Sequence, residues 1–152
     1  MQRTISLELP KYRELCDLIH SYNFIVNLHL YESLCNGTVS KLKLHHLLYP
    51  QIRIDYPKFP SALIQCARDN AVEMLKGNKN NPFTRKKLDS SIRFDSRTTK
   101  VLLESGELQL TTMEGRKKYS IKIPNYFQKY FSWKVKSVTG YRKKKIEIEN
   151  HC

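Results

Sequence analysis

The sequence lacks any apolar stretch long enough to cross a membrane. Its longest apolar-looking run, Phe24 to Tyr31, is interrupted by Asn27 and His29. The first residues lead into an alternating segment and not into a continuous apolar stretch, so no secretory signal peptide is evident. We therefore expect no membrane partner and a cytoplasmic location inside the cell.

Cysteine is scarce, with four residues far apart in the chain: Cys16, Cys35, Cys66 and Cys152. They form no CxxC pair and have no metal-ligand spacing to a histidine. The pair His45 and His46 does not change this, because adjacent side chains diverge on a helix. We expect reduced thiols and no metal site.

Glycine is scarce as well, and the five glycines form no phosphate-binding loop. No Ser/His/Asp set has a local signature. The fourteen acidic residues are scattered, mostly beside basic ones, without the strand-end carboxylate cluster of a two-metal nuclease. The sequence therefore predicts no catalytic residues and no cofactor.

Positive charge is abundant and unevenly distributed. The formal net charge is +13. Residues 1–76 contain nine Lys/Arg and seven Asp/Glu, whereas residues 77–152 contain eighteen and seven. Clustered cations bind polyanions by releasing the counterions of the phosphates, so nucleic acid is the leading candidate partner.

The first half of the chain has mostly helical periodicity. Alternation over residues 5–9 predicts a strand that Pro10 ends. Apolar residues then recur at three- and four-residue spacing over 11–34, which predicts a helix. Further helices are expected over 40–49, before Pro50, and from residue 60 or 61 to Lys76.

The second half alternates with period two. It predicts short strands at Ile92/Phe94, Val101/Leu103, Leu108/Leu110, Tyr119/Ile121/Ile123, Trp133/Val135 and Ile146/Ile148. The expected turns are Gly106, Glu114-Gly115, Pro124-Asn125 and Thr139-Gly140. Such strands favour a small barrel or sandwich. Strand 5–9 has no partner among the helices, so we expect it to pair with this sheet.

The predicted fold class is α+β, a small antiparallel β-barrel with a helical insertion of about three helices. The expected parts are a first strand (1–10), a helical insertion (11–77), a basic linker (78–90) and the barrel (91–152).

Basic residues gather at the expected turns and strand ends. These RNA-binding candidates are Arg85, Lys86, Lys87, Arg93, Arg97, Arg116, Lys117, Lys118, Arg142, Lys143, Lys144 and Lys145. Aromatic residues lie among them: Phe94, Tyr119, Tyr126, Phe127, Tyr130, Phe131, Trp133 and Tyr141. Cations interleaved with aromatics suit phosphate contact and base stacking, although aromatics at alternating positions also fill cores.

The polar face of the third helix presents Ser61, Gln65 and Arg68. Gln and Arg side chains can read base edges in DNA. The same residues also fit an ordinary solvent-facing surface, with Ser61 capping the helix.

Five stretches carry a family resemblance. Arg3–Pro10 looks like an opening strand, Asn23–Asn27 is similar to an "RFVYN" segment, and Phe59–Gln65 is similar to "LPSQLxQ". Ser91–Arg97 and Thr112–Arg116 are similar to an "IRYDxR…TxxGR" pair. In this order they resemble the N-terminal half of TnpB-type proteins, the RNA-guided DNA endonucleases of insertion-sequence transposons in prokaryotes.

In that family the helical part is called REC and the barrel WED. The resemblance implies that the barrel grips a structured guide-type RNA, through Arg93, Arg97, Arg116 and the run 142–145. It also implies that the helices hold the guide–target duplex and read a short motif in double-stranded DNA, with Ser61 and Gln65 as candidates.

The chain departs from the family in two places. Asn23 stands where the family has an arginine, and the sequence ends before a RuvC-like nuclease with its metal ligands and zinc element. We expect a truncated TnpB-like protein that binds nucleic acid and is not an enzyme as it stands. The alternatives are part of a metal-dependent endonuclease completed by a RuvC portion, a general RNA-binding or ribosome-associated protein, and a module that binds an acidic protein.

Overall fold

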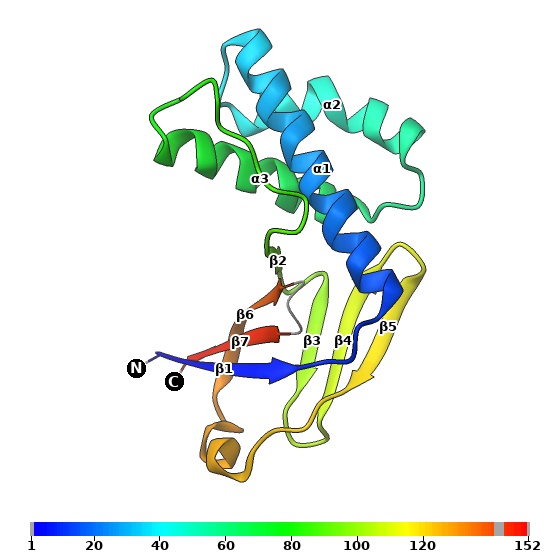
Figure 1. The fold of residues 1–152 in the computed structure, drawn as a ribbon, viewed down its shortest axis with the longest axis vertical. Helices are drawn as coiled ribbons and strands as arrows, with labels where there is room; N and C mark the ends of the chain where they lie inside the picture. Colours follow the sequence, from blue (N-terminus) through cyan, green and yellow to red (C-terminus); the bar gives the residue numbers. More distant parts are fainter. Residues whose placement is uncertain (1, 142–144, 152) are drawn as a thin grey trace. The chain divides into compact units, whose positions relative to one another are not determined.

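The structure, a computed structural model, describes residues 2–141 and 145–151, with side chains described from residue 3 to 140. Figure 1 shows α-helices and two antiparallel sheets, so the predicted α+β class is confirmed. The chain forms two compact units. We call Met1–Ile19 with Ser91–Cys152 the β unit, and His20–Ser90 the helical unit.

The first helix, α1 (Arg13–Asn36), confirms the periodicity of the sequence. Its residues Tyr22, Ile25 and Val26 are fully or almost fully buried. The helix ends at Gly37, which has a φ of 59°. Glycine adopts this left-handed conformation without strain, and it lets the amide of Thr38 donate to the carbonyl of Ser33 at 3.1 Å.

The second helix, α2 (Lys41–Asp55), is longer than predicted, because it continues through Pro50. Proline inside a helix removes one hydrogen bond and crowds the preceding turn. Two tertiary interactions offset this cost. Ile52 is buried, and the guanidinium of Arg53 donates to the carbonyl of Phe59 at 3.0 Å.

The third helix, α3 (Ser61–Gly77), agrees with the prediction. Its buried face consists of Leu63, Ile64, Ala67, Ala71, Val72 and Leu75. Pro60 is the N-cap residue and no side chain caps the helix, so the capping role considered for Ser61 is not observed.

The larger sheet of the β unit has the strand order β1-β7-β6-β2. Its strands are β1 (Gln2–Glu8), β7 (Lys145–His151), β6 (Lys134–Tyr141) and β2 (Ile92–Phe94). β1 pairs antiparallel with β7, with Ile5 opposite Ile148. The expected pairing of the first strand with the later sheet is therefore confirmed.

The smaller sheet has the order β3-β4-β5, with β3 (Thr99–Leu102), β4 (Glu107–Thr112) and β5 (Gly115–Ser120). β5 ends at Ser120, before the predicted positions Ile121 and Ile123. A 3-10 helix, η1 (Asn125–Tyr130), follows.

The turn predicted at Thr139-Gly140 is wrong, because both residues lie inside β6. Gly140 packs closely against Phe94. A Cβ atom at this position would lie 3.3 Å from the ring of Phe94, which is tighter than most such contacts.

A buried histidine makes the helical unit sensitive to acid. His29 is 1% exposed, and its Nδ1 lies 2.8 Å from the carbonyl oxygen of Ile25. Burial, with a smaller contribution from the positive charge of Arg68, lowers the pKa of His29 from 6.5 to about 4. Protonation therefore favours the unfolded chain between these two values.

We predict that stability falls as the pH drops through about 6.5 towards 4, and that it is fully present above this window. The linked loss is about 3 kcal/mol, at about 1.4 kcal/mol per pH unit. Urea unfolding at both ends of the window measures it. His29→Gln should remove this loss, and His46→Gln, at an exposed position, should keep it. Equal acid sensitivity in the two variants would contradict the assignment.

Candidate nucleic-acid interface

The exposed face of the β3-β4-β5 sheet carries cations from two strands. β4 alternates strictly, with Leu108, Leu110 and Thr112 buried. In an antiparallel sheet, directly opposed residues point to the same face. Gln109 of β4 is opposite Lys100 on one side and Lys118 on the other, so these three side chains form a row on the face away from the buried leucines.

Arg116 belongs to the same face, because it lies opposite Thr111, two residues from Gln109. Lys100, Arg116 and Lys118 are all exposed. We call these three residues the cationic sheet face. Lys100 and Lys118 are two strand spacings apart, about 10 Å. One acid shares this sheet face, Glu107, whose carboxylate accepts from the Gln109 side chain at 2.6 Å.

The run Arg116-Lys117-Lys118 does not act as one cluster. The pleat turns Lys117 to the opposite side of the sheet, where it is half-buried. Its ammonium lies 3.6 Å from the carboxylate of Glu114. Only the two outer members of this run therefore contribute to the cationic sheet face.

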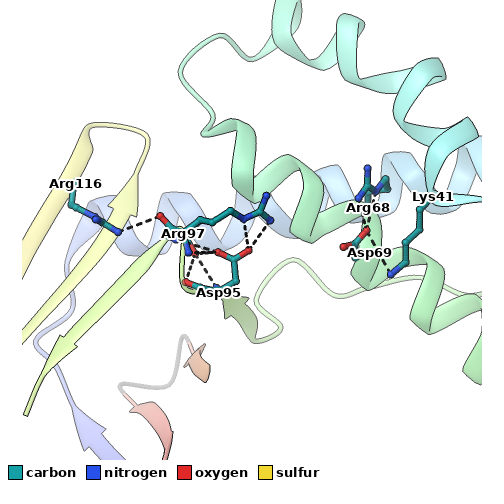
Figure 2. A network of polar contacts seen from close by, with 7 residues as sticks. Lys41, Arg68, Asp69, Asp95, Arg97 and Arg116 are labelled. Carbon is teal, nitrogen blue, oxygen red and sulfur yellow. Dashed lines mark hydrogen bonds and ion pairs between the residues drawn. The ribbon is translucent and has the colours of Figure 1, made fainter. Parts of the chain in front are cut away.

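A tight turn holds Arg97 next to this face. The Asp95 carboxylate accepts from the backbone amides of Arg97 at 2.9 Å and Thr98 at 3.2 Å. It also pairs with the Arg97 guanidinium at 2.7 Å, so Asp95 is both a turn residue and an ion-pair residue. Figure 2 shows Arg116 reaching this turn and donating to the carbonyl of Arg97 at 3.3 Å.

Arg97 is both paired and partly exposed. Its side chain is 51% exposed beside Asp95. An exposed ion pair of this kind contributes about 0–1 kcal/mol, so a phosphate can compete with Asp95 for the guanidinium. Arg93, in the middle of β2, is exposed between buried Ile92 and Phe94.

The basic segment 78–90 has no helix or strand but is tied to α1. The side-chain amide of Asn23, which is fully buried, donates to the carbonyls of Leu88 and Ser90 at 2.8 Å each. The Asn27 side chain donates to the Lys86 carbonyl and accepts from the Lys86 amide, both at 2.8 Å.

Because the segment is held against α1, its three cations have different surroundings. The Lys86 ammonium donates to Asn70 at 2.8 Å and lies 5.1 Å from the ring centroid of Tyr22, so it is directed into the helical unit. Arg85 and Lys87 are exposed. Sequence reasoning treated the three as equivalent, and only these two face solvent.

The DNA-binding candidates on α3 differ in their exposure to solvent and in their ion pairs. Arg68 pairs with its neighbour Asp69 at 2.8 Å and is only 16% exposed. Figure 2 shows Asp69 also meeting Lys41 of α2, at 3.8 Å. Ser61 is exposed and Gln65 is half-buried. The guanidinium of Arg68 thus joins a network between α2 and α3.

The aromatic candidates divide between core and surface. Phe94, Tyr119 and Tyr130 are buried. Tyr119 packs 4.8 Å from the ring of Tyr12 and donates its hydroxyl to Glu14 at 3.1 Å. Burial, together with this bond, raises the pKa of Tyr119. Among the aromatic candidates whose side chains are described, Tyr126 is the most exposed.

Some candidates lie outside the described part of the chain. The run Arg142, Lys143 and Lys144 is not described, and of Lys145 only the backbone, in β7, is described. The side chain of Tyr141 is likewise outside the described residues.

Sequence reasoning missed Lys100. It is an isolated lysine, so a search for basic runs passes over it. Only the strand register reveals it, because Gln109 lies opposite Lys100 on one side and Lys118 on the other, and this requires the pairing of three strands.

We predict that Asn23→Ala lowers the free energy of unfolding by about 2–4 kcal/mol, because it removes two hydrogen bonds and leaves two carbonyls without their partner. Asn36→Ala is the matched control, since exposed Asn36 on the same helix bonds only within α1 and should change stability by less than about 0.5 kcal/mol. Chemical denaturation measures both. Equal effects would show that Asn23 does not hold the segment.

Across the described residues, no group of three or more His, Cys, Asp or Glu side chains is placed to hold a metal ion. No helix in this described part of the chain is long and apolar enough to span a membrane. A scan of protein-family models finds no family that matches the chain, and no curated protein matches its sequence. The functional interpretation therefore rests on the residues themselves.

Proposed function

We propose that this chain is a nucleic-acid-binding module that holds structured RNA against the β unit, without cleaving it. The observation that carries the proposal is the common direction of Lys100, Arg116 and Lys118 on one sheet face, with Arg97 fixed next to it. Like charges on one face repel each other, and phosphates of a bound strand relieve that repulsion.

The geometry suits a backbone contact better than base reading. Long cationic side chains from the sheet reach phosphates of different spacing and carry no sequence information. The polar row through Gln109 can add hydrogen bonds to sugars or phosphates. We therefore expect affinity from charge and selectivity from the shape of a folded RNA.

The resemblance to TnpB-type proteins makes a guide-type RNA the partner that we propose, with double-stranded DNA as a further ligand of α3. Exposed Ser61 and neighbouring Gln65 are the candidate DNA contacts, while Arg68 holds the helix pair through Asp69. In this proposal the chain is a TnpB-like binding half, and cleavage would require residues outside it.

We also propose that the two sheets of the β unit form one small barrel of the WED kind. Two features support this. β2 and β3 are consecutive strands joined by the Asp95 turn. The amide of Thr111 on β4 donates to the carbonyl of Thr98 at 2.9 Å, which links this turn to the smaller sheet.

The test is a salt titration of binding to a fluorescent hairpin RNA, with matched variants. The triple variant Lys100→Ala, Arg116→Ala, Lys118→Ala removes the cationic sheet face. The control Lys43→Ala, Lys58→Ala, Lys76→Ala removes the same charge from exposed positions of the helical unit. The wild-type protein should lose roughly a hundred-fold in affinity between about 50 and about 200 mM salt if it neutralises about four phosphates.

The first triple variant should reduce the slope of log K against log salt by about two to three, and the control should leave it almost unchanged. Equal losses in both variants would mean that net charge alone acts, and an affinity independent of salt would refute the proposal.

The RNA that copurifies with the protein distinguishes the rival functions. One structured species favours a guide, and bulk ribosomal RNA favours a ribosome-associated protein. Binding to an acidic protein that survives nuclease treatment favours an interaction module.

A further inference from the structure

A continuous strip of aromatic rings follows the smaller sheet. The rings of Tyr126 and Phe127 lie 5.3 Å apart, those of Phe127 and Tyr130 lie 6.3 Å apart, and those of Tyr130 and Trp133 lie 4.6 Å apart. We call these four residues the aromatic strip. Hydrogen bonds of the 3-10 helix η1 and of the turn after it fix their order, among them the amide of Trp133 donating to the Tyr130 carbonyl at 2.9 Å.

One end of the strip is open to solvent and carries a cation. Tyr126 is 65% exposed. The ammonium of Lys129 lies 4.2 Å from the ring centroid of Tyr126 and 5.2 Å from that of Tyr130. The ammonium lies over one face of the Tyr126 ring, so a base stacks on the opposite face or takes the place of the ammonium, which then meets a phosphate.

The other end of the strip borders a hollow. Trp133, Phe131 and Val135 form one wall of it, and residues 101–105 form the other. The volume of about 360 Å³ is within the usual range for sites that take small organic groups, about 300–1,000 Å³.

The hollow combines polar and apolar surface in similar amounts, and Glu104 is among the residues that line it. A carboxylate repels phosphate but accepts hydrogen bonds from the amino group of a base, so the hollow suits a base better than a phosphate. The hydroxyl of Ser105 donates to the Leu102 carbonyl at 3.4 Å.

We propose that the aromatic strip and this hollow bind unpaired bases of a single-stranded RNA segment. One base stacks on Tyr126, with Lys129 meeting its phosphate, and a second base enters the hollow against Trp133. The proposal rests on the proposed function and adds the ligand class of a second site in the same unit, namely unpaired nucleotides with an amino group. An acidic peptide is the rival occupant.

Binding to two probes of equal phosphate number tests this. An oligo(A) strand has bases available for stacking, and a short RNA duplex does not. Tyr126→Ala should weaken oligo(A) binding roughly five- to hundred-fold and leave the duplex within about twofold, whereas Tyr126→Phe should retain wild-type binding. Phe83→Ala is the matched control, because Phe83 is an exposed aromatic in the helical unit, at 86%.

Trp133 reports on the hollow directly, because it is the single tryptophan of the chain. Oligo(A) should quench its fluorescence, and an abasic strand of equal charge or a poly-glutamate peptide should not. Quenching by the abasic strand or the peptide, or oligo(A) binding unaffected by Tyr126→Ala, would overturn the base site. If the duplex still binds in a salt-dependent way, the proposed function stands; if neither RNA binds at low salt, both proposals fail.

Discussion

The pleat of the three-stranded sheet is the constraint on which the candidate interface depends. Leu108, Leu110 and Tyr119 must face the core, and they therefore force the residues between them to the opposite side. Arg116 and Lys118 occupy two of those positions on β5, and strand pairing aligns them with Lys100. A register shift of one residue would exchange the two sets, burying cations and exposing leucine.

The β unit combines two kinds of surface that differ in the free energy they cost when no ligand is bound. Cations on the sheet repel each other but stay hydrated, so they cost little until a polyanion arrives. The aromatic strip instead exposes one ring largely to water, that of Tyr126, while Tyr130 is buried, and Lys129 lies over the Tyr126 ring. Together they match the two parts of a nucleotide, the phosphate and the base.

Sequence patterns predicted the parts of the fold that depend on local periodicity. The three α-helices and most strands follow from the spacing of apolar residues. The pairing of the first strand follows from its lack of a partner among the helices. The continuation of α2 through Pro50 goes together with the burial of Ile52 and the bond from Arg53 to the Phe59 carbonyl, which the apolar periodicity does not contain. Similarly, Gly140 looked like a turn residue because its packing partner, Phe94, is far away in the sequence.

The sequence predicted the candidate site as a set of basic residues. The structure shows in which direction the side chains of the described residues point. Lys86 is directed into the helical unit, Lys117 lies on the opposite side of the sheet, Arg68 pairs with Asp69, and Lys100 joins the face. Backbone NMR of the protein titrated with hairpin RNA tests the central claim most directly. The largest amide shifts should fall at residues 97–100 and 116–118, and shifts confined to α2 and α3 would contradict the account.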